Sequence, residues 1–278
     1  MRLETVRAAA LTALLGAMPI AVPAARAEAQ SPRGTVLADL TWLEAEKVLT
    51  PEAVVVIPLG AEAKEHGPHL RLDNDLRLAT YYRGRVLAAS EVIVAPTVNY
   101  HFYPSFVEYP GSTHLRFETA RDLLVDIVRS LSNYGPKRFY VLNTGVSTVG
   151  PLKAAQEILE KEGIRFTFTD IIAISAEADR QVSKQVRGTH ADEMETSAML
   201  YMYPDRVDMS KAVRDDSERG TGGLGRTPGT TKTYSPSGVW GDATLATREK
   251  GRVAVEATVA GILREIESLR AQRVAPAP

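Results

Sequence analysis

The 278-residue sequence contains no cysteine. This absence excludes disulfide bonds, thiolate metal sites and cysteine nucleophiles, so any metal ion must be held by His, Asp or Glu. An excess of charge of either sign is missing too, because 33 Lys and Arg face 34 Asp and Glu. Nucleic-acid binding needs a basic face, which this balance does not supply. We therefore expect no nucleic-acid partner.

Long apolar runs are also missing, apart from one at the start of the chain. Ala8–Val22 follows Arg2 and Arg7, and Ala25-Arg26-Ala27 has the small-x-small pattern of a cleavage site. The run is shorter than the ~20 residues of a membrane span, and prolines interrupt it. Residues 1–27 are thus predicted to be a Sec-type signal peptide cleaved after its final alanine. The mature protein is expected to be secreted or periplasmic, without a membrane segment.

Beyond this segment, short apolar runs alternate with amphipathic ones. Runs rich in β-branched residues predict strands buried on both faces, as in a parallel sheet, at 53–58, 92–96, 139–142 and 166–174. Helices are predicted where apolar residues recur at i, i+3 and i+4 or where glycine or proline marks a helix end. These helices are at 40–48, 75–89, 117–134, 151–162, 193–203 and 248–270.

This alternation predicts one α/β domain over residues 28–272, with three layers and a mostly parallel sheet flanked by helices. Within it, residues 28–38 are expected to form a loose lead-in. Residues 215–238, rich in Gly, Thr, Ser and Pro, are expected to form a long surface loop. Residues 273–278 are predicted to be a disordered tail.

Metal-binding residue types gather directly after the first predicted strand. Only five histidines occur in the chain, and His66 and His69 lie here, followed by Asp73 and Asp75. Imidazole and carboxylate groups are the ligands of Zn²⁺, Mn²⁺ or Fe²⁺, and ligand sites of parallel sheets lie at the carboxyl ends of strands. The segment is a candidate metal site. The alternative is a charged surface loop whose aspartates cap the next helix.

Four motifs, in order, resemble those of the creatininase (creatinine amidohydrolase) family. They are Pro58-Leu-Gly60 with Glu65-His66-Gly67-Pro68-His69-Leu70 and Asp75, then Phe106–Thr113, His190–Leu200 and Gly238–Gly251. The resemblance covers about residues 40–270, with the motifs in the expected order. The resemblance implies a creatininase-like fold and a hydrolase of an amide bond, often cyclic, in a small molecule. It also implies one or two divalent ions (Zn, Mn or Fe) and a homo-oligomer, commonly a hexamer.

The resemblance further implies that a Glu, a His and an Asp of the first motif bind metal. His66 and Asp75 match the family pattern directly. The position where the family usually has its Glu is Lys64, and a protonated lysine is a poor metal ligand. Either Glu65 or Glu62 is then expected to supply the carboxylate.

Other residues are predicted to act on the substrate. A divalent ion would make water nucleophilic at neutral pH, and His190 could give a proton to the leaving nitrogen. Glu195 is expected to orient His190 or a metal ligand, or else to complement the helix N-terminus. His101, Asn143 and Trp240 are candidate substrate contacts. The alternative for His101 and for Trp240 is a packing role.

One segment departs from the family. After the third predicted strand the family has Asn-Gly-His-Gly-Gly-Asn or a His-x-Glu variant, whereas this chain has Gly145 and Ser147 in place of the ligand His and Glu. A non-catalytic binding or structural protein of the same fold is therefore the second hypothesis. A Ser147 nucleophile is a third, disfavoured because the Gly-x-Ser-x-Gly elbow is absent.

Overall fold

Five parallel strands form the central sheet of the computed structural model, which describes residues 32–273. Their order is β1-β3-β2-β4-β5. They span β1 (Thr35–Val36), β2 (Val54–Leu59), β3 (Ile93–Val94), β4 (Arg138–Asn143) and β5 (Arg165–Phe168). The predicted parallel α/β sheet is thereby confirmed. The signal segment and residues 274–278 of the tail lie outside the described residues, and the homo-oligomer stays a prediction.

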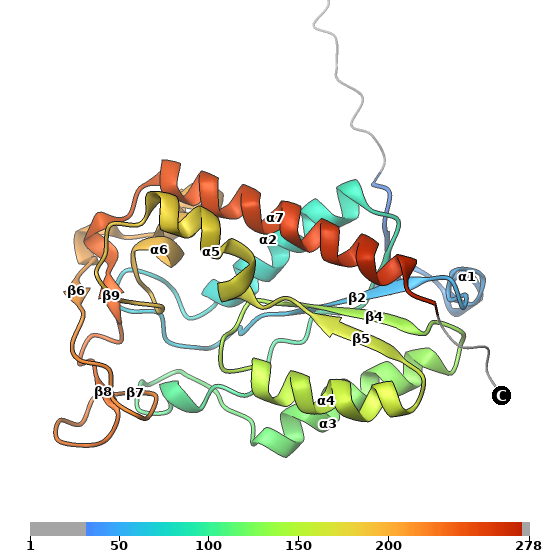
Figure 1. Cartoon of the computed structure of the whole chain (residues 1–278), viewed down its shortest axis with the longest axis horizontal. Helices are drawn as coiled ribbons and strands as arrows, with labels where there is room; N and C mark the ends of the chain where they lie inside the picture. Colours follow the sequence, from blue (N-terminus) through green and yellow to red (C-terminus); the bar gives the residue numbers. More distant parts are fainter. Residues whose placement is uncertain (1–31, 274–278) are drawn as a thin grey trace, which may run out of the picture. The chain divides into compact units, whose positions relative to one another are not determined.

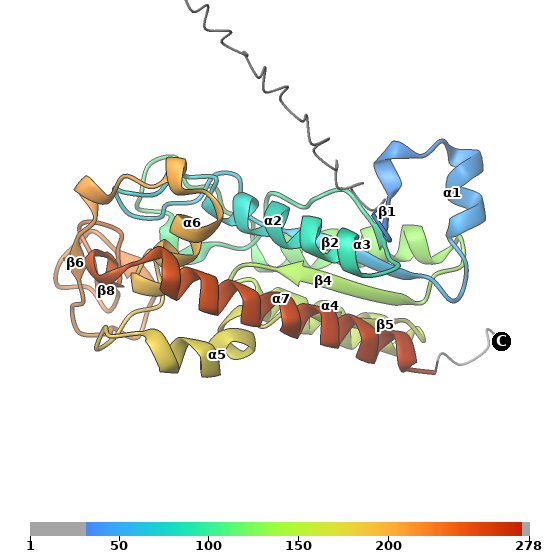
Figure 2. The same cartoon turned by 90° about the horizontal axis from the view of Figure 1, so that it is seen from above.

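Helices cover both faces of this sheet (Figure 1). One face carries α2 (Asn74–Ala89), α5 (Ile171–Val182), α6 (Glu193–Met202) and α7 (Arg248–Ala271), and Figure 2 shows α7 running between α2 and α5. The other face carries α3 (Phe117–Ser132) and α4 (Val149–Lys161), together with α1 (Trp42–Val48). Among the described residues no helix combines the length and apolarity needed to cross a membrane.

The residues of β2 divide the core into two halves. Val54 and Val56 pack with the α2 and α7 side, while Val55 and Ile57 pack with the α3 and α4 side. Successive side chains of a strand point to opposite faces, so a strand covered on both sides is apolar throughout. All six residues of β2 are accordingly buried.

The prediction for residues 166–174 was wrong in its second half. The strand ends at Phe168, and Ile171 begins α5. The Asp170 side chain caps this helix by accepting a hydrogen bond from the Ala173 backbone N–H at 3.1 Å. A short apolar run fits either a strand or a buried helix, and packing of α5 against α7 decides here.

The predicted lead-in and loop also contain short elements. Residues 35–36 form β1, because their backbone pairs with β3. Within and beside 215–238, two short pairs form: β6 (Arg214–Asp215) with β9 (Gly241–Asp242), and β7 (Leu224–Gly225) with β8 (Thr233–Tyr234). Single 3₁₀ turns occur at Leu37–Asp39, Pro104–Phe106, Pro204–Arg206, Met209–Lys211 and Ala243–Leu245.

The order of the strands creates the place for a site. The chain leaves β2 through α2 on one face to reach β3, and then returns through α3 on the other face to β4. Ligand sites of open parallel sheets lie where the connections diverge in this way, outside the carboxyl ends of the strands. The segment that follows β2 holds the predicted metal ligands.

Candidate metal centre

His66 lies between hydrogen-bond acceptors on both sides. Its Nδ1 is 2.9 Å from the Lys64 carbonyl oxygen, and its Nε2 is 2.9 Å from Asp75 Oδ1 and 3.4 Å from Glu195 Oε1. A neutral imidazole carries only one N–H, which the carbonyl requires. Nε2 therefore needs a cation between itself and the carboxylates, either a proton or a metal ion. This environment fits a metal ligand whose orientation is set by a backbone carbonyl.

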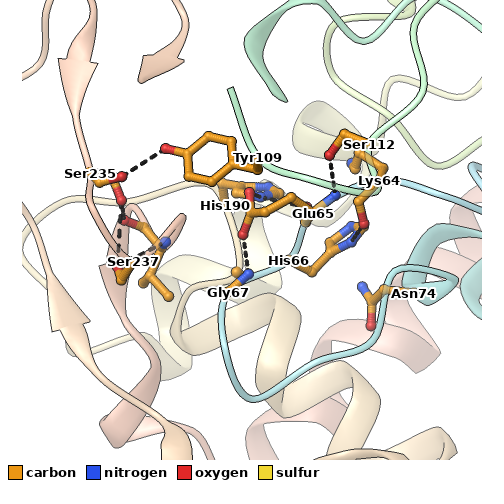
Figure 3. A network of polar contacts seen from close by, with 12 residues as sticks. Lys64, Glu65, His66, Gly67, Asn74, Tyr109, Ser112, His190, Ser235 and Ser237 are labelled. Carbon is orange, nitrogen blue, oxygen red and sulfur yellow. Dashed lines mark hydrogen bonds and ion pairs between the residues drawn. The ribbon is translucent and has the colours of Figure 1, made fainter. Parts of the chain in front are cut away.

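His190 has the complementary arrangement. Its Nε2 lies 3.1 Å from Glu65 Oε2 and 3.1 Å from the Glu65 carbonyl oxygen, so this nitrogen donates. Nδ1 is left to face Glu195 Oε2 at 3.8 Å. Burial by itself would lower the pKa of His190, but the charge and hydrogen bond of Glu65 together with the charge of Glu195 outweigh it and raise that pKa. Figure 3 shows Glu65 between His190 and Gly67, whose N–H donates to the same carboxylate.

Glu195 is held at the start of α6. Its Oε2 accepts the Ala191 N–H at 2.7 Å, and its Oε1 accepts from Asn74 Nδ2 at 3.0 Å. Ala191 is the one non-glycine among the described residues with positive φ (47°), a strained conformation that directs its N–H toward Glu195. Burial opposes ionisation, but the positive charges of His66 and His190 lower the pKa of Glu195.

These three residues form a candidate site for one divalent ion. His66, His190 and Glu195 each offer one ligand atom, and the three atoms lie within 4.8 Å of one another. The rings of His66 and His190 lie 5.2 Å apart between centroids and are tilted by 37°. Two imidazoles and a carboxylate are a ligand set of Zn²⁺ and Mn²⁺ enzymes, so the residues present fit such an ion.

Asp75 lies beside this cluster but is paired with a lysine. Lys64 Nζ is 2.7 Å from Asp75 Oδ2, and the two side chains are 6% and 1% exposed. Burial would raise the pKa of Asp75, yet the charges of Lys64 and His66 hold it well below its usual range. The ammonium also lies 4.9 Å from the centroid of the Phe106 ring. Both oxygens of Asp75 are thus occupied by cationic or hydrogen-bonding neighbours.

The cluster opens into a pocket of about 640 Å³. Lys64, His190 and Glu195 line it, and so do Trp240 and Ser147. The backbone of Trp240 pairs with that of His190, with N–H···O distances of 2.9 and 3.3 Å, so the Gly238–Gly251 motif positions this histidine. A substrate in the pocket would contact the metal ligands directly.

The remaining predicted residues lie around this centre rather than in it. Glu65 contacts His190, and Glu62 is exposed and accepts a hydrogen bond from Asn99. Asn143 is buried and donates to the carbonyls of Gly145 and Thr169, at 2.7 and 3.1 Å. Their roles as ligands or substrate contacts stay predictions. That Lys64 is buried and pairs with Asp75 was not predicted from the sequence. The position of Lys64 between apolar and ligand-type residues could have indicated a buried charge.

His101 is buried away from the pocket lining, and neither ring nitrogen has a hydrogen-bond partner in the structure. Burial lowers its pKa to about 4, because the imidazolium would lose its hydration. The predicted substrate contact is not tested by this placement. Because His101 is buried in its neutral form, it should make the stability of the protein depend on pH.

His101→Leu should reduce the loss of unfolding free energy that occurs when the pH falls. Between pH 6.5 and 4 the unfolded chain binds a proton at residue 101 that the folded chain does not, so wild-type stability falls as pH falls. At pH 5 this one histidine costs the wild type about 2 kcal/mol. Urea unfolding at pH 7.5 and pH 5 measures the difference. If the unfolding free energy falls equally in both proteins between pH 7.5 and pH 5, the lowered pKa of His101 is contradicted.

The sequence also matches a known protein family and several of its members. The family model of creatininase (creatinine amidohydrolase) matches residues 38–266. Creatinine amidohydrolase of Pseudomonas putida is 26% identical, covering 83% of this chain and 95% of its own length. Mycofactocin precursor peptide peptidase of Mycolicibacterium smegmatis is 29% identical, covering 71% and 78%.

Solved structures agree as well. A creatininase structure described with Mn superposes with a TM-score of 0.71 at 25% identity, covering 86% of this chain and all (100%) of that one. A mutant creatininase of Zn–Zn type gives 0.70 at 25% identity, covering 85% and 98%. Both relatives above are named as hydrolases, and the matched model spans most of the sequence. The chain belongs to the creatininase family.

Proposed function

We propose that this protein hydrolyses an amide bond in a small molecule with one divalent ion held by His66, His190 and Glu195. The observation that carries the proposal is the convergence of their three ligand atoms within 4.8 Å beside a pocket. When bound, the ion would supply a nucleophilic water at neutral pH and polarise the scissile carbonyl. The hydrolase relatives support the class of reaction, and the Mn and Zn forms of neighbouring structures support the metal.

The chain's own residues would complete the site. Lys64 presents a fixed positive charge at the pocket wall, suited to the negative charge that develops on a carbonyl oxygen during attack. Phe106 and Trp240 supply apolar surface to the pocket. The hydroxyl oxygens of Thr144 and Ser147 donate to backbone carbonyls and can still accept a hydrogen bond from a substrate. In this proposal His190 is a metal ligand through Nδ1, because its Nε2 is engaged by Glu65.

Removal of metal tests the proposal. The purified chain would be stripped with a chelator, reloaded with Mn²⁺ or Zn²⁺, and assayed on creatinine, other cyclic amides and short peptides. We expect hydrolysis of at least one amide by the reloaded protein, loss of that activity on chelation, and its return with the ion. Turnover that persists at full rate in the stripped protein would rule out a metal-dependent mechanism.

A non-catalytic binding protein is the second candidate. It is favoured by Gly145 and Ser147, which stand where the family has ligands, and by the Lys64–Asp75 ion pair. Ser147 Oγ donates to the Phe102 carbonyl at 3.0 Å, so the hydroxyl serves the loop structure. Tight binding of one ion without turnover of any amide in the panel would favour this candidate over the hydrolase.

A further inference from the structure

Lys64 is the one buried lysine among the described residues. An ammonium group is seldom buried without a charged partner, and here the partner is Asp75 at 2.7 Å. The side chain lies against Phe106 and Tyr103, at 4.9 and 5.7 Å from the ring centroids. The aromatic rings shield the pair from solvent, so its charges interact strongly.

The ammonium lies on a carboxylate that also contacts the candidate ion site. Asp75 accepts His66 with one oxygen and Lys64 with the other, and His66 in turn faces Glu195. The carboxylate thus bridges the imidazole of the candidate ion site and the lysine. An ionised carboxylate can hold one cation on each of its two oxygens, and here the cation on Oδ2 is the ammonium of the chain itself.

A divalent ion at Asp75 Oδ2 would have to occupy the place of the ammonium or lie beside it. The like charges would repel each other at short range inside a shielded site. Gly145 and Ser147 leave no imidazole or carboxylate from the end of β4 that could offset this repulsion. The second position is therefore not suited to a metal ion while Lys64 is present.

We infer that Lys64 serves as a built-in cation that takes the place of a second metal ion and limits the centre to one divalent ion. The inference deepens the proposed function and rests on it only for the first ion. It concerns the number of ions bound, so binding measurements test it without any assay of turnover.

The test compares Mn²⁺ binding by the full chain and its Lys64→Glu variant. Lys64→Glu replaces the cation by a carboxylate next to Asp75. Equilibrium dialysis of metal-free protein against Mn²⁺, followed by elemental analysis, should find one more ion per chain in the variant than in the wild type. The matched control is Lys153→Glu, which makes the same charge change on an exposed part of α4 and should bind as many ions as the wild type.

A second variant keeps the test decisive if Lys64→Glu does not fold. Lys64→Gln removes the charge that pairs with the buried Oδ2 of Asp75, so its metal-free Tm should fall by about 10 °C. Mn²⁺ should then raise the Tm of Lys64→Gln more than that of the wild type, because the ion replaces the lost charge.

The outcomes separate this inference from the proposed function. One extra ion in Lys64→Glu supports the inference. If the wild type binds no ion, the proposed function is contradicted, and an extra ion in Lys64→Glu still supports the role of Lys64 as the cation that excludes a metal ion from Asp75. Equal numbers of ions in Lys64→Glu and the wild type would overturn the inference, as would an extra ion in Lys153→Glu. For Lys64→Gln, a Mn²⁺-induced rise in Tm no larger than that of the wild type would overturn it.

Discussion

Replacement of His66 by alanine is expected to abolish metal binding and hydrolysis together. The imidazole supplies one of only three ligand atoms, and its Nε2 faces both Asp75 and Glu195. Loss of residues that merely orient a ligand already costs 10- to 100-fold in metal affinity, so removal of a ligand should weaken binding by more than about 100-fold. Titration with Zn²⁺ measures the affinity, and the amide panel measures turnover.

Folding of the His66→Ala variant should survive, because Lys64 still neutralises Asp75. Circular dichroism and Tm in the metal-free state check this point. His114→Gln is the matched control, since His114 is exposed and outside the cluster, and glutamine can still accept the hydrogen bond of the Tyr103 N–H. Retention of full metal affinity by His66→Ala would refute the assigned centre.

Among substitutions of glycine by alanine near the site, Gly251→Ala is expected to destabilise the fold most. A methyl at this position would lie 1.8 Å from the Ser197 carbonyl oxygen and 2.4 Å from its carbonyl carbon. Both atoms belong to the backbone of α6, so no change of rotamer relieves the clash, and α6 and α7 must separate. Overpacking of this kind costs about 3 kcal/mol.

Because α6 carries Glu195, the same substitution should also weaken metal binding. Urea unfolding measures the loss of stability, and Zn²⁺ titration measures the affinity. Gly84→Ala is the control within helix α2: nothing lies within 4 Å of the added methyl, so the variant should gain about 0.5–1 kcal/mol. If Gly251→Ala is as stable as Gly84→Ala, the close approach of α6 and α7 is not a constraint on the fold.

Much of the fold could be predicted from local pattern. The buried strand at Val54–Leu59 and the helix at Phe117–Ser132 follow from continuous apolar composition and from the i, i+3, i+4 spacing. The error at Ile171–Ile174 arose because four apolar residues satisfy both periods, and only the neighbouring α7 distinguishes them. Residues 35–36 were unpredictable as a strand, because two residues carry no period of their own and pair only through β3.

Composition, spacing and motif order determined by themselves that the chain is an α/β protein with imidazole and carboxylate groups after its first buried strand. They also marked His66, His190 and Glu195. Only the tertiary structure decided that these three converge while Asp75 is taken by Lys64. Distances between segments more than 120 residues apart, such as the 121 residues between Asn74 and Glu195, depend on how α6 and α7 pack on the sheet, and no local pattern encodes them. The pairing of Asp75 with the Lys64 ammonium is therefore a property of the folded chain.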